Sequence, residues 1–261
     1  MHVNLPRPLH GWRAFVGEVG VIVLGVLIAL GAQQAVEALH WRNETATLRE
    51  NLHREIRDDQ WNAALRVMIS GCIRQRIARL QNELNRPGAA WAADPIQGGE
   101  ERRWSALPIA FKFPSMQSFY TSGQWQTALA SGELAHMPDG ERNGYSYTYQ
   151  AIADLEAFSA QEDALAGRLQ PLARDRQLDN KQRLDFEAQL ASLDHLNVIQ
   201  TIYSRKFLEG TRRSGIVPRP ENIEDAYHWA RAEYGACATP LGSTADALSP
   251  DNNASKVKPE G

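Results

Sequence analysis

The chain has 261 residues and a net charge of −3; 43% of its residues are hydrophobic and 23% are charged. This is an ordinary composition for a folded chain, and the length suits one helical domain beside a membrane anchor. No basic surplus supports a nucleic-acid partner, and two cysteines are too few for a disulfide-built mini-domain or a cysteine zinc site.

The first predicted element is the apolar segment GEVGVIVLGVLIALGAQQ, residues 17–34. Residues 14–32 carry a single charge, Glu18, and nearly reach the roughly 20 residues that cross a bilayer. Trp12 and Trp41 bracket the segment about 43 Å apart along a helix, close to the separation of the two membrane interfaces, where tryptophan concentrates. We therefore predict a transmembrane helix over residues 14–35 with both tryptophans at the interfaces.

Two other interpretations of this segment stay open. A cleaved export signal could end at Ala29-Leu30-Gly31, which resembles a small-x-small cleavage site, and a soluble core helix could have the same composition. Glu18 does not suit the basic leader of a signal, and residues 32–52 continue as good helix formers. These two observations favour an uncut anchor.

The flanking charges predict the orientation. Arg7, Arg13 and the α-amino group precede the segment, whereas acidic and basic residues alternate after it. The positive-inside rule then predicts a bacterial inner-membrane protein with a single span, a cytoplasmic tail (residues 1–13) and a periplasmic domain (residues 36–237).

Two stretches resemble a bacterial family of single-span membrane proteins of unknown function. The first, AFVGEVGVIVLGVLIALGAQQ followed by HWRNE, covers residues 13–44, with a longer spacer before Trp41 than the family has. The second, SFYTSGQWQTALASGELAHMPDGERNGYSYTY, covers residues 118–149 more loosely. The resemblance implies an N-terminal anchor and an exported helical domain; because the family has no agreed activity, it implies nothing about function.

Beyond the anchor the pattern is helical throughout, so we predict an all-α fold: the transmembrane helix continues into a long helix that packs with a helical bundle. No proline occurs between residues 9 and 85, so we expect one long helix or two helices end to end, and Asp58-Asp59 and Gly71 are the places that best suit a bend. The apolar stripe comprises Leu48, Leu52, Ile56, Leu65, Ile69, Cys72, Ile73, Ile77, Leu80 and Leu84. The opposite, solvated face comprises Arg49, Glu50, Arg54, Arg57, Arg66, Arg74, Arg76 and Glu83.

Four shorter helices are predicted after a Gly- and Pro-rich connector at residues 87–114, whose Trp91 and Trp104 should pack on the bundle. They cover residues 115–131, 139–169, a segment that starts at Asp179 and passes Phe207, and 220–235, and Leu184 is expected on the apolar stripe of the third. Residues 238–261 have little apolar content and are predicted to be a disordered tail.

The two cysteines, Cys72 and Cys237, are predicted to form a disulfide, because an exported domain lies in an oxidising compartment. Such a bond would bring the last helix beside the middle of the first long helix. The alternative is a buried thiol at Cys72 and a free surface thiol at Cys237.

No motif predicts catalysis, so we expect no enzyme, no cofactor and no metal site. His228 and Glu233 do not share a helix face well, and Tyr120, Tyr145, Tyr147 and Tyr149 suit core packing better than a ligand pocket. Glu18 lies near the cytoplasmic edge of the span, where it either reaches the headgroups or makes a contact within the membrane. Gly17, Gly25 and Ala29 form a small-residue face suited to helix packing.

These observations leave two functional hypotheses. The first is a membrane-anchored interaction or scaffold module whose partners are the lipid bilayer and either a second copy or another membrane protein. The second is a periplasmic ligand-sensing bundle that acts through a partner.

Overall fold

The computed structural model describes residues 12–86, 90–92, 120–213 and 215–242, and the predicted all-α fold is confirmed. The helices are α1 (Trp12–Leu84), α2 (Gly123–Ser131), α3 (Asp139–Leu169), α4 (Asn180–Arg213) and α5 (Pro220–Tyr234), with short 3-10 helices η1 (Glu133–His136), η2 (Gln170–Ala173) and η3 (Gly235–Cys237). Within the described ranges, the one β-type pairing is an isolated bridge between Trp91 and Arg176.

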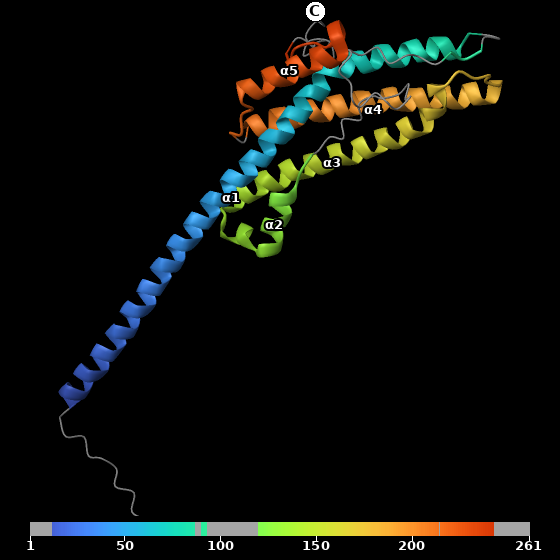
Figure 1. Ribbon diagram of the computed structural model, residues 1–261. Helices are drawn as coiled ribbons and strands as arrows, with labels where there is room; N and C mark the ends of the chain where they lie inside the picture. Colours follow the sequence, from blue (N-terminus) through green and yellow to red (C-terminus); the bar gives the residue numbers. More distant parts are fainter. Residues whose placement is uncertain (1–11, 87–89, 93–119, 214, 243–261) are drawn as a thin grey trace, which may run out of the picture.

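Helix α1 has 73 residues and no interruption. Its N-terminal part extends away from the other helices, its middle part lies within the body, and its last turns run along α4 (Figure 1). The first buried residue is Thr45, and Leu48, Leu52 and Ile56 follow at helical spacing. One continuous helix therefore serves both as the exposed apolar segment and as the central element of the core.

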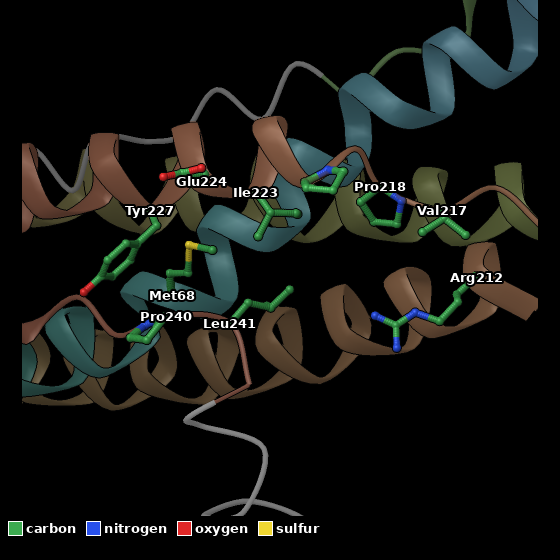
Figure 2. A pocket seen from close by; sticks show the side chains of 10 residues that line it. Met68, Arg212, Val217, Pro218, Ile223, Glu224, Tyr227, Pro240 and Leu241 are labelled. Carbon is green, nitrogen blue, oxygen red and sulfur yellow. The ribbon is translucent and has the colours of Figure 1, made fainter.

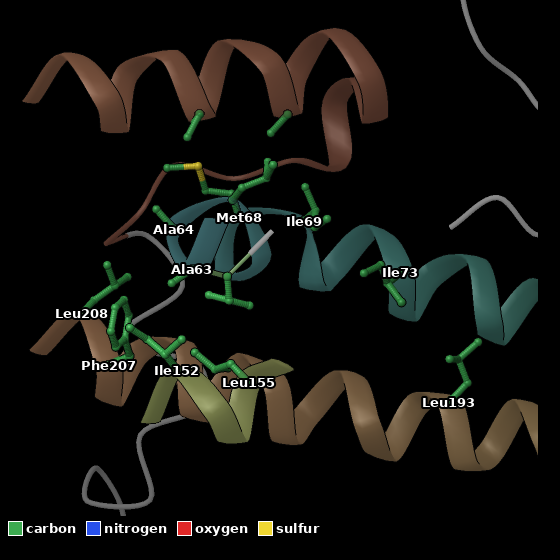
Figure 3. Packing of buried hydrophobic residues seen from close by; sticks show 14 of the residues in the cluster. Ala63, Ala64, Met68, Ile69, Ile73, Ile152, Leu155, Leu193, Phe207 and Leu208 are labelled. Atoms are coloured by element: carbon green, nitrogen blue, oxygen red, sulfur yellow. The ribbon is translucent and has the colours of Figure 1, made fainter. Parts of the chain in front are cut away.

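The bend predicted at Gly71 is present. Figures 1 and 3 show α1 changing direction between the turn that holds Met68 and the turn that holds Ile73. Two backbone carbonyls here accept hydrogen bonds from outside the helix: Met68 from the Thr239 N–H at 3.1 Å, and Ser70 from Asn197 Nδ2 at 3.1 Å. Outside donors at a Ser-Gly pair are a known cause of helix bending.

The core forms where α1 runs between α4 on one side and α5 on the other (Figure 1). Residues 63–70 are all buried, so this part of α1 is enclosed on every face. The apolar side chains of this segment pack against Ile152 and Leu155 of α3 and Phe207 and Leu208 of α4 (Figure 3). The burial of such apolar side chains is the main favourable term in the free energy of folding.

Most predicted helix ends agree with the structure, but the start of the helix predicted over residues 115–131 is wrong. Helix α2 begins at Gly123, residues 120–122 are not helical, and residues 115–119 lie outside the described residues. Asp179 precedes α4 and accepts the Gln182 N–H at 2.8 Å, while Gln182 returns a bond to the Asp179 N–H at 3.1 Å, a reciprocal capping box. Gly132 ends α2 with φ +78°, a conformation that favours glycine. Helix α3 begins at Asp139 and ends at Leu169, as predicted, whereas Leu184 is 65% exposed and does not lie on the buried stripe of α4.

The predicted disulfide joins Cys72 and Cys237, with Cα atoms 5.2 Å apart. As expected, α5 returns beside α1 (Figure 1). The prediction of disorder from residue 238 is wrong for residues 238–242, because Ala238 is buried and the Thr239 N–H bonds to α1. Residues 243–261, the N-terminal tail 1–11 and Trp104 lie outside the described residues.

Candidate functional site

The exposed part of α1 is long and apolar enough to cross a membrane, by length and composition. None of its membrane-length apolar window is buried in the body. Trp12 is 78% exposed, and a Cβ atom added at Gly17 or Gly25 would meet no atom within 4 Å. Ala29 and Glu18 are also exposed, so the helix-packing face has no partner within the described chain.

Trp41 marks the point where this segment meets the body. Its ring stacks on the imidazole of His136 in η1, with ring centroids 3.5 Å apart and planes inclined by 10°. The predicted interfacial tryptophan is thus also a packing residue of the body. If residues 14–35 cross the membrane, Trp41 lies about 9 Å beyond the span, and the stack lies at headgroup level.

A buried ion pair links α1 to α3. Arg66 Nη1 donates to Glu162 Oε2 at 2.8 Å and Arg66 Nη2 donates to Oε1 at 2.9 Å, and both side chains are about 95% buried. The expectation that Arg66 lies on a solvated face is wrong. Its side chain points instead toward α3, where Glu162 pairs with the guanidinium inside the core.

Two amides of α4 complete this network. Asn197 Oδ1 accepts from Arg66 Nη2 at 3.1 Å, and its Nδ2 donates to the Ser70 carbonyl. Gln200 Nε2 lies 3.2 Å from Glu162 Oε2. Three helices therefore share one buried polar cluster, which fixes their register because an unpaired charge in the core is costly.

Two further buried carboxylates hold the start of α2 against α1. Glu55 accepts the Gln124 N–H at 3.1 Å through Oε1 and the Tyr149 hydroxyl at 2.7 Å through Oε2. Asp59 accepts the Thr121 N–H at 3.0 Å through Oδ1. Asp59 Oδ2 has no hydrogen-bond partner among the described residues.

The environment of Asp59 disfavours its charge. Burial is the main cause, and the nearby carboxylates of Glu55, Asp58 and Glu156 add to it; together they raise the pKa of Asp59 to about 8. The Thr121 N–H opposes this rise. Burial also raises the pKa of Tyr149.

The free energy of unfolding is expected to fall as the pH rises from 3.8 to about 8, the ordinary and the folded pKa of Asp59. Because the folded pKa is about 8 and the ordinary value is 3.8, the folded state retains a proton that the unfolded state has already released between these values. Thermal unfolding of the full chain in detergent should show Tm falling by roughly 5–10 °C from pH 6 to pH 9.

Replacing Asp59 with asparagine should remove most of this pH dependence, since the amide oxygen can still accept the Thr121 N–H. The matched control is Asp225→Asn, because Asp225 is exposed and is not among the groups that shift the pKa of Asp59. Parallel pH curves for the wild type and Asp59→Asn would show that Asp59 ionises normally.

The four tyrosines separate into a buried group and one exposed residue. Tyr120, Tyr145 and Tyr149 are buried, and Tyr145 contacts His53 Nε2 at 2.8 Å through its hydroxyl. Tyr147 is exposed and lines a cavity of about 230 Å³ between α3 and α4, together with Asp154, Tyr203 and Lys206. Core packing, the favoured expectation, describes three of the four.

A larger groove, of about 400 Å³, lies between the end of α4, α5 and the segment that follows Cys237 (Figure 2). Its lining is Met68, Arg212, Val217, Pro218, Pro220, Ile223, Glu224, Tyr227, Pro240 and Leu241. Eight of these ten residues are apolar or aromatic, which is the usual character of a small-molecule site. No sequence motif indicated this groove, because its walls come from four separate segments.

The other residues that could take part in catalysis or metal binding do not form a cluster in the described part of the chain. His228 pairs with Glu224 at 3.5 Å rather than with Glu233, and both partners are largely exposed. Within the ranges that the structure describes, no three histidine, cysteine, aspartate or glutamate side chains form a group that could hold a metal ion. No protein-family model, curated protein or solved structure matches the chain.

Proposed function

We propose that this protein is a single-pass protein of the bacterial inner membrane, with a cytoplasmic N-terminus and a periplasmic helical body that acts as an interaction or scaffold module. The observation that carries this proposal is the continuity of α1, whose apolar, unburied N-terminal part leads directly into the core. The basic residues before the segment support the orientation. The disulfide supports an oxidising compartment.

We also propose membership of the single-span family that residues 13–44 and 118–149 resemble. For the partner, we favour a second copy of the chain. Gly25 and Ala29 allow close helix approach, and Val36 and Leu39 continue an exposed apolar face beyond the proposed span. This face lies opposite Trp41 and Leu48, which contact the body, so two bodies could sit on the outer sides of a parallel helix pair.

A second candidate function is ligand sensing through such a partner. The apolar groove beside α5 favours it, because a helical scaffold alone has no need of an open apolar site. The two functions are compatible, since a bound ligand could alter how the body meets its partner.

The anchor is tested by fusing a reporter that is active only outside the cytoplasm to the C-terminus. We expect reporter activity, and full-length protein that stays in membranes after an alkaline wash. A photoreactive residue at position 39 should then crosslink the chain to a second copy, and the same residue at the exposed Tyr147 serves as the control.

A soluble product that starts near Ala32 would instead identify a cleaved signal. An inactive reporter would indicate the opposite orientation, with the C-terminal body in the cytoplasm. A crosslink at position 39 to a different protein would replace the second copy as the partner and keep the scaffold role.

A further inference from the structure

We propose that the groove between α4, α5 and residues 238–241 binds a linear amphipathic anion, an alkyl chain that ends in a carboxylate. This inference rests on the proposed ligand-sensing function and gives it a class of ligand. If the groove does not bind such an anion, the proposals of a membrane anchor and a scaffold role are unaffected. Three features of the groove support this ligand: its apolar lining, one cation at its end and the restricted backbone of its walls.

The long wall of the groove is apolar. Val217, Ile223 and Leu241 supply aliphatic side chains, and Met68 of α1, 1% exposed, forms the base. Val217 is 57% exposed, so its side chain gains apolar burial when a ligand covers it. An alkyl chain fits this lining, whereas a polar ligand would find few hydrogen-bond partners along it.

A single cation stands at one end of the groove. Figure 2 shows Arg212 at one end and Tyr227 at the other, with the apolar side chains between them. Among the described residues no ion pair occupies Arg212, whereas its neighbour Arg213 pairs with Glu209. A guanidinium binds a carboxylate through two parallel hydrogen bonds, which makes a carboxylate the matching head group.

The one acidic residue of the lining agrees with this orientation. Glu224 is on α5, 73% exposed at its side chain, and it pairs with His228. It offers no site to an anion, so the carboxylate belongs at the Arg212 end and the alkyl chain extends toward Tyr227.

The walls are fixed before a ligand arrives. Pro218, Pro220 and Pro240 restrict the backbone on both sides of the groove. The segment that carries Pro240 and Leu241 is attached to α1 by the Cys237 disulfide and by the Thr239 N–H bond to Met68. Because these bonds and prolines restrict the movement of the walls, ligand binding requires little reorganisation of the groove.

The test uses the full chain in phosphatidylcholine nanodiscs and a dodecanoate analogue with a photoreactive diazirine near its methyl end. Peptide mass spectrometry should place crosslinks around Ile223 and Tyr227. Unlabelled dodecanoate should compete for labelling, and dodecanol should compete poorly because it lacks the carboxylate.

Three variants distinguish specific recognition from nonspecific apolar labelling. Arg212→Glu should reduce labelling about tenfold or more, while Arg213→Glu, the same change one residue further along α4, should leave it nearly unchanged. Ile223→Trp should also abolish labelling, because it fills the groove without changing the charge.

Equal labelling of all variants, or equal competition by dodecanol, would overturn the proposal. A photoreactive residue at position 223 provides an independent check. If it crosslinks only to the chain's own C-terminal residues or to a second copy, the groove is a docking site for protein and the proposal is wrong.

Discussion

Replacing Glu162 with alanine is expected to lower the free energy of unfolding by about 3–5 kcal/mol. The substitution leaves Arg66 buried without its carboxylate partner, and Asn197 alone cannot neutralise a guanidinium. A loss of this size is a large part of the stability of a typical domain. Denaturant unfolding of the full chain in detergent, followed by far-UV circular dichroism, measures it.

The chain contains a matched control for this prediction. Arg49 and Glu141 form the same two-bond pair between the same two helices, at 2.5 and 2.9 Å, but their side chains are 36% and 28% exposed. Glu141→Ala should therefore lower the free energy of unfolding by about 1 kcal/mol or less. Equal losses for both substitutions would show that burial does not decide the outcome.

A double replacement tests whether the fold requires this ion pair or only requires that neither buried charge is left without its partner. Arg66→Met with Glu162→Leu removes both charges and keeps much of the volume, so we expect most of the stability of the wild type to return. If the double variant is as unstable as Glu162→Ala, the loss must come from Asn197 and Gln200, whose amides would then be buried without their charged partners.

Replacing both cysteines with serine is expected to reduce stability by about 5 kcal/mol. The bond closes a loop with a sequence separation of 165, and the chain-entropy relation gives this value for a loop of that length. Since 1 kcal/mol corresponds to about 2–4 °C in a domain of this size, Tm should fall by roughly 10–20 °C. Thermal unfolding of wild type and Cys72→Ser/Cys237→Ser, both without reductant, tests this.

Reduced wild-type protein is the control, and it should unfold close to the double variant. Thiol labelling of the denatured, unreduced protein gives an independent readout. Two reactive thiols per chain would show that the bond does not form where the protein resides, and would weaken the case for export.

The helices could be predicted because their signals are local. The apolar stripe from Leu48 to Leu84 recurs at helical spacing, Asp179 with Gln182 forms a capping box, and Gly132 supplies the conformation that ends α2. The disulfide followed from the number of cysteines and the predicted export.

The buried polar cluster could not be predicted, because its members are far apart in the chain. Arg66 is one of several arginines that follow the apolar segment of α1, the others being half-buried or exposed, and only the position of α3 shows that this one is covered. The sequence suggests Asp59 only as part of a bend, because its hydrogen-bond partner in the core, Thr121, is 62 residues away. The groove is lined by four segments between Met68 and Leu241, and only the folded chain brings them together.

The unbroken course of α1 has a mechanical consequence. From the proposed end of the span at residue 35 to the bend at Gly71 the helix covers about 54 Å. A tilt change of about 10°, such as a thinner bilayer imposes on a spanning helix, would move that point sideways by roughly 9 Å. Because no loop separates residue 35 from the body, a span in the proposed position would make the body a lever arm, and a change in the angle of the helix in the lipid would become a larger sideways displacement of the body.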